Sequence, residues 1–89
     1  MSENRKINAI YKSREKILEI LEEIRPDVDF KGETKLMDDG VLDSFDIVSI
    51  ISELNDEFNI EIRINELIAD NFNSLEAIQK MTTRLQKKD

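Results

Sequence analysis

The sequence predicts an all-α fold, a small four-helix bundle with three main helices, one short helix and a long first loop. Apolar residues recur at helical spacing in three separate segments. Only two glycines and one proline interrupt the 89 residues, and no cysteine supplies a disulfide framework. A chain of this length builds one small core, so we expect a single domain over residues 9–87, after a flexible N-terminal extension of residues 1–8.

The first helix is predicted from about Ile10 to Arg25. Its apolar stripe at helical spacing is widened by two further residues, Leu18 and Ile20. The stripe consists of Ile10, Ile17, Leu21 and Ile24. Pro26 ends the helix, because the residue before a proline avoids the helical region.

A long connection, residues 27–43, follows without a sustained hydrophobic period. A loop of this length is unusual in so small a domain and is often functional, although it can also be a packed crossover between antiparallel helices. Scattered apolar residues are expected to anchor it to the core. These are Val28, Phe30, Leu36, Val41 and Leu42.

The second helix is predicted from Ser44 to about Phe58. Its core side is defined by apolar residues that fall within one narrow sector of the helix, with Ile50 on the margin. Phe45 and Val48 lie on a separate flank, which is expected to be an exposed apolar step. The core sector consists of Ile47, Ile51, Leu54 and Phe58.

The opposite side of this helix is acidic, and we expect it to face solvent. Its residues are Asp46, Glu53, Asp56 and Glu57.

Residues 60–64 alternate between apolar and charged residues, as a strand would, but a helical chain offers no second strand for pairing. We therefore expect an extended linker whose three isoleucines fill the core. One short helical turn follows within residues 65–70. The last helix is predicted over residues 74–87, and Asn73 with Glu76 resembles a capping box at its start.

Several function classes are excluded by residues that the chain lacks. Without His and Cys it has neither the commonest zinc ligands nor the usual base of nucleophilic catalysis, so we expect no enzyme activity. Gly32 and Gly40 stand alone and form no glycine-rich phosphate loop. No run approaches the roughly 18 apolar residues of a membrane span. We expect a soluble, cytoplasmic monomer.

Negative charge is concentrated in the middle of the chain. Residues 27–76 hold 14 acidic residues against three basic ones, whereas the segments on either side are net basic. This balance argues against nucleic acid, whose binding depends on Lys and Arg that neutralise phosphates. It favours a protein partner with a basic surface.

The most informative run is residues 38–48, in which one serine opens the acidic second helix directly after the irregular loop. Ser44, or Asp43 before it, can act simply as the helix N-cap, and Asp46 in the first turn suits the helix dipole. These interpretations need no further function.

Taken together, however, the run resembles the prosthetic-group site of acyl carrier proteins. That site is an Asp-Ser-Leu-like tripeptide after a Gly-x-x step, and here the sequence reads Gly40-Val41-Leu42-Asp43-Ser44-Phe45. Residues 57–62 and 71–78 are similar to two later segments of the family, in the same order. The resemblance covers about residues 10–86.

The resemblance implies a carrier. In that family a phosphopantetheinyl transferase attaches 4′-phosphopantetheine from coenzyme A to the serine that matches Ser44. The terminal thiol then holds an acyl or aminoacyl group as a thioester, which a loading ligase supplies and downstream synthases or transferases receive. These enzymes present basic docking patches to the second helix. The matching contacts here are Asp43, Phe45, Asp46, Val48, Glu53, Asp56 and Glu57.

The resemblance leaves the cargo open. Fatty acid carriers usually have Leu where this chain has Phe45, while Leu42-Asp43-Ser44-Phe45 is similar to D-alanyl carrier proteins. We favour fatty acid or related synthesis as the pathway. The alternative is an unmodified acidic helical adaptor for a basic partner, and a small carboxylate enzyme is a third interpretation.

No dedicated metal site is expected. Four carboxylates crowd one end of the second helix, so Mg²⁺ or Ca²⁺ should bind at most weakly and relieve their repulsion. They belong to Asp38, Asp39, Asp43 and Asp46.

Overall fold

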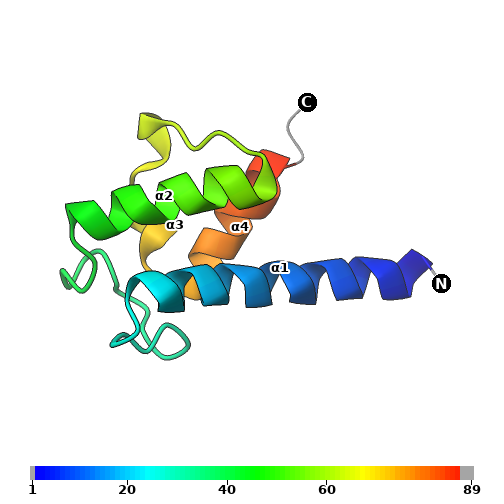
Figure 1. Cartoon of the computed structure of the whole chain (residues 1–89), viewed down its shortest axis with the longest axis horizontal. Coiled ribbons are helices and arrows are strands. Elements are labelled where there is room, and N and C mark those ends of the chain that lie inside the picture. The colour runs from blue at the N-terminus through cyan, green and yellow to red at the C-terminus, as the bar shows by residue number, and fades with distance from the viewer. Residues whose placement is uncertain (1, 87–89) are drawn as a thin grey trace.

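The computed structural model describes residues 2–86, with side chains from Ser13 onward. Over this range the chain is all-α, as predicted, and contains no strand. α1 and α2 lie side by side, and α4 packs against both of them (Figure 1). The elements are α1 (Ser2–Ile24), α2 (Ser44–Phe58), the 3-10 turn η1 (Ile64–Glu66), α3 (Ala69–Phe72) and α4 (Leu75–Gln86).

The first helix begins at Ser2, so its expected start near Ile10 is wrong. Its N-terminal end reaches past the ends of the other helices (Figure 1). Residues 2–9 are mostly polar but contain no Gly or Pro, and Glu, Arg and Lys are good helix formers. Helical propensity therefore favours a helix that continues back to Ser2. The division into an extension of residues 1–8 and a domain of residues 9–87 stays a prediction.

The core lies between α1, α2, α4 and the loop of residues 25–43, which we call the leading loop. Ile50 is fully buried, whereas Ile51 and Phe58 are only half-buried, so the core side of α2 is rotated slightly from the predicted sector. The fully buried apolar residues are Ile17, Leu21, Phe30, Leu36, Ile50, Leu54, Phe72, Leu75, Ile78 and Met81.

Residues 59–74, which we call the trailing segment, depart from the expected linker. Ile62 is buried, and its N–H donates to Asn55 Oδ1 at 2.9 Å. Ile64, however, is 86% exposed. An alternating segment would direct both residues to one side, but η1 begins at Ile64 and turns that side chain away from the core. Two short helices, η1 and α3, replace the single predicted turn.

The predicted capping box of α4 is wrong. Ser74 caps the helix, since its Oγ accepts a hydrogen bond from the Ala77 N–H at 3.0 Å. The Asn73 side chain instead reaches the leading loop, where its Oδ1 accepts from the N–H groups of Met37 at 2.9 Å and Asp38 at 3.0 Å. The Asn73 side chain therefore accepts hydrogen bonds from two backbone N–H groups of the loop and does not cap α4. The predicted end of this helix at Lys87 lies outside the described residues.

Candidate functional site

Ser44 is the first residue of α2, and Asp43 is its N-cap. Asp43 Oδ1 accepts from the Asp46 N–H at 2.9 Å, and Asp46 Oδ2 accepts from the Asp43 N–H at 3.0 Å, which completes a capping box. The cap left open by the sequence is therefore Asp43. Ser44 is exposed, and its hydroxyl has no hydrogen-bond partner among the residues that the structure describes.

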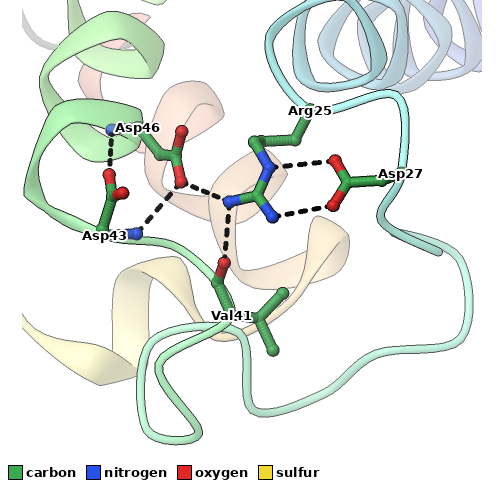
Figure 2. A network of polar contacts seen from close by, with 5 residues as sticks. All are labelled: Arg25, Asp27, Val41, Asp43 and Asp46. Atoms are coloured by element: carbon green, nitrogen blue, oxygen red, sulfur yellow. Dashed lines mark hydrogen bonds and ion pairs between the residues drawn. The ribbon is translucent and has the colours of Figure 1, made fainter.

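Asp46 does not face solvent, which corrects the sequence-based prediction. It is only 9% exposed, because it turns back to cap Asp43 and to meet Arg25. Figure 2 shows the Arg25 guanidinium between Asp27 on one side and Asp46 with the Val41 carbonyl on the other. Nη1 donates to Asp46 Oδ2 at 2.6 Å and to the Val41 carbonyl oxygen at 2.9 Å.

The other edge of the Arg25 guanidinium is held by Asp27. Nε donates to Asp27 Oδ1 at 3.0 Å and Nη2 to Oδ2 at 2.8 Å, a two-point pairing that fixes the plane of the group. The hydrogen bond from Arg25 lowers the pKa of Asp27. The pKa of Arg25 is raised, first by the hydrogen bond to Asp27 and then by that to Asp46.

Sequence reasoning missed Arg25 as a residue of this site. It lies 21 positions before Asp46, and no periodicity links the two. The available signal was weak: a single arginine directly before Pro26, at the border of the acidic middle of the chain.

A hollow of about 440 Å³ lies beside Ser44. Its lining is mainly apolar and combines the leading loop, the start of α2 and one residue of the trailing segment. The lining residues are Met37, Gly40, Leu42, Asp43, Ser44, Ile47, Val48 and Leu67.

The remaining predicted docking residues lie on the surface. Phe45 is 85% exposed, and Val48 is also exposed. Ile64 and Ile68, which the sequence did not single out, are two further exposed apolar side chains. The acidic docking candidates that the structure leaves exposed are Asp43, Glu53, Asp56 and Glu57.

The four aspartates near this end of α2 do not form the expected crowd. Asp46 is paired with Arg25, and Asp38 Oδ2 accepts from Asn73 Nδ2 at 3.0 Å. Across the described side chains, no group of three or more carboxylates is arranged to hold a metal ion. Residues 2–86 also contain no helix with the length and apolarity needed to cross a bilayer.

The site fits a covalently attached arm. Ser44 offers an accessible hydroxyl that no cap contact occupies, beside a hollow that can receive part of a long group. The start of α2 also carries the positive end of the helix dipole, which favours a phosphodiester at this position.

Comparison with known proteins agrees with this geometry. The family described as "Phosphopantetheine attachment site" matches residues 14–81. The D-alanyl carrier protein of Streptococcus sanguinis (strain SK36) is 35% identical over 71 residues, which cover 79% of this chain and 90% of that protein. The D-alanyl carrier protein of Streptococcus suis (strain 05ZYH33) is 38% identical over 66 residues, or 73% and 84% of the two chains.

A relative from another genus extends the comparison. The D-alanyl carrier protein of Listeria welshimeri is 36% identical over 67 residues, which cover 73% of this chain and 86% of that protein. The family match spans most of the chain and includes the whole segment around Ser44. The protein therefore belongs to the phosphopantetheine-binding carrier family, whose members carry a covalent 4′-phosphopantetheine group and are not themselves enzymes.

Proposed function

We propose that this protein is an aminoacyl carrier that holds D-alanine as a thioester on a 4′-phosphopantetheine arm attached to Ser44. One observation carries the assignment of Ser44. Asp43 and Asp46 together form the capping box of α2, so the exposed Ser44 hydroxyl is not needed as a helix cap.

In the loading reaction, the Ser44 hydroxyl oxygen forms a bond to the phosphorus of coenzyme A that carries pantetheine. The bond from that phosphorus to the adenosine bisphosphate part breaks, and this part leaves. The hydroxyl proton passes to a base on the transferase. Once attached, the arm supplies the thiol that the chain lacks.

The relatives support D-alanine as the cargo. The three relatives described above, from Streptococcus and Listeria, are named D-alanyl carrier proteins, and the Leu42–Phe45 tetrapeptide is similar to that group. The expected preference for fatty acid synthesis gains no support from them, and we replace it. The loading partner is then a ligase that activates D-alanine.

The surface beside Ser44 supports docking to basic partners. Asp43, Glu53, Asp56 and Glu57 supply charge, while Phe45 supplies an exposed apolar contact with Val48 next to it. We leave Asp46 out of this surface, because its carboxylate is already bonded to Arg25. Transferase and ligase would each approach α2 along this side, guided by opposite charge.

The test of the attachment site is the intact mass after incubation with coenzyme A and a broad-specificity phosphopantetheinyl transferase. Wild type should gain the mass of one arm, and Ser44→Ala should gain none. Ser49→Ala, which removes another exposed serine of α2, should load like wild type. Failure of wild type to load with several transferases would favour the unmodified adaptor instead.

The test of the cargo uses the loaded protein. Incubation with D-alanine, ATP and a D-alanyl carrier ligase should add one D-alanyl group that hydroxylamine releases, as it does from thioesters. A parallel reaction with a fatty acyl carrier synthetase and a long-chain fatty acid should add nothing. The opposite pattern would return the protein to fatty acid synthesis.

A further inference from the structure

We propose that Arg25 is a positioning residue for the loading of Ser44, since it ties the end of α1 to the chain on both sides of that serine. This inference rests on the proposed function and concerns the same site. It assigns a role in loading to a residue that lies 19 positions before Ser44 and outside the sequence motif.

Arg25 is anchored through both its backbone and its side chain. The Arg25 N–H donates to the Leu21 carbonyl at 2.9 Å, so the residue continues the hydrogen bonding of α1, which packs against α2 and α4. Asp27 grips the outer edge of the guanidinium through two hydrogen bonds. The residue is therefore held through its backbone and through the outer edge of its side chain.

The Arg25 Nη1 donates hydrogen bonds to two groups on either side of Ser44. The Val41 carbonyl lies three residues before Ser44, and the Asp46 carboxylate lies two residues after it. The same Asp46 oxygen also accepts from the Asp43 N–H. One guanidinium thus connects the last loop residues to the first turn of α2, while Ser44 itself stays untouched and accessible.

Removing Arg25 would release this connection and leave a charge without its partner. Asp46 is nearly buried, and a carboxylate in that position needs hydrogen-bond donors. It would turn toward solvent or keep only its backbone contact, and either change alters the start of α2. Loading requires the Ser44 oxygen to align with a phosphorus held by another protein, and small displacements slow such reactions strongly.

Arg84 provides a matched control within the same chain. It also makes a two-point pairing with a nearly buried carboxylate: Nη2 lies 2.6 Å from Glu66 Oε1 and Nη1 lies 3.1 Å from Oε2. The two carboxylates have similar side-chain exposure, 12% for Asp46 and 14% for Glu66. Arg84 connects α4 to the trailing segment and contacts neither Val41 nor the capping box.

The experiment compares initial rates of loading, measured by intact mass with coenzyme A and a transferase, at a temperature where each variant is folded. Arg25→Ala should load about tenfold more slowly than wild type or worse. Arg84→Ala should load at the wild-type rate. Arg25→Lys keeps the positive charge but loses the planar guanidinium and its paired hydrogen bonds, so its loading rate should lie between those of wild type and Arg25→Ala.

Amide hydrogen exchange supplies a readout that does not depend on the transferase. The Asp46 N–H donates to Asp43 in the capping box, and its exchange rate should rise in Arg25→Ala. The rate should stay at the wild-type value in Arg84→Ala. A structural role alone would lower stability in both variants without separating their loading rates.

The outcomes are distinguishable. No loading of wild type overturns the proposed function, and this inference with it. Normal loading of both wild type and folded Arg25→Ala overturns the inference alone. If Arg25→Ala does not fold, Arg25→Lys decides: slower loading by a folded protein supports positioning, and an unchanged rate rejects it.

Discussion

The two irregular segments on either side of α2 make similar ion pairs but differ in the burial of their apolar side chains. Each is tied to a neighbouring helix by an arginine and a nearly buried carboxylate: Arg25 of the leading loop pairs with Asp46 of α2, and Glu66 of the trailing segment pairs with Arg84 of α4. The leading loop nevertheless buries Phe30, Leu36 and Leu42, whereas the trailing segment leaves Ile64 and Ile68 exposed.

The difference lies in which residues of each segment reach the core. The leading loop places Phe30, Leu36 and Leu42 in the core, and its residues Arg25, Asp27 and Val41 belong to the polar network shown in Figure 2. The trailing segment buries Ile62 and Phe72 and makes polar contacts through Glu66 to Arg84 and Asn71, while Ile64 and Ile68 stay exposed. Both segments contribute to the core, but of the two only the trailing segment leaves large apolar side chains exposed.

The largest expected effect is a difference in the free energy of unfolding between a substitution in the leading loop and one in the trailing segment. Leu36→Ala should lower the free energy of unfolding by about 2–5 kcal/mol, because it opens a cavity in the core. Ile64→Ala removes an exposed side chain and should change it by less than about 0.5 kcal/mol. Urea denaturation of both variants measures the difference, and equal losses would contradict the contrast between a buried loop residue and an exposed one.

A smaller loss is expected from the capping box of α2. Asp46→Ala removes the acceptor shared by Arg25 and the Asp43 N–H, and should destabilise the protein by about 1–3 kcal/mol. Glu53→Ala on the exposed side of the same helix is the control and should be nearly neutral. A neutral Asp46→Ala would mean that its contacts contribute little in solution.

The left-handed residues of the two segments should respond differently. Gly40 has φ +70°, so Gly40→Ala forces a Cβ into an unfavourable conformation and should cost about 1 kcal/mol. Asn59 has φ 53° at the end of α2, where glycine is also suitable, so Asn59→Gly should be close to neutral. Thermal unfolding compares the two, and an unaffected Gly40→Ala would show that this turn relaxes.

The smallest effect is a pH dependence of the leading loop. Arg25 holds the pKa of Asp27 below its ordinary value of 3.8. A lowered pKa contributes stability that is fully present above the ordinary value and disappears as the pH falls through the folded value. Asp27→Asn should therefore flatten the loss of stability below about pH 4, only modestly because the side chain is exposed. Melting temperatures between pH 2 and pH 5 give the slopes, and identical slopes would refute the link.

Much of the architecture was predictable because it depends on local patterns. The cores of α1, α2 and α4 follow apolar periodicity, and the long leading loop follows from its absence. The position of Ser44 at the start of α2 was also correct. The predictions that were wrong have separate causes: Asp46 and Asn73 have partners far along the chain, η1 redirects Ile64, and residues with good helix propensity extend the start of α1.

The sequence by itself determined the helices and the serine motif, since helix formation and capping involve residues only three or four positions apart. Only the tertiary structure decided which polar groups meet. Asp46 could have faced solvent on periodicity alone, but Arg25 at the end of α1 and the Asp43 N–H together turn it inward. A nearly buried carboxylate is stable only beside such donors. The Asp43 N–H is a local donor, but Arg25 lies 21 positions before Asp46, so no local pattern reveals this second partner.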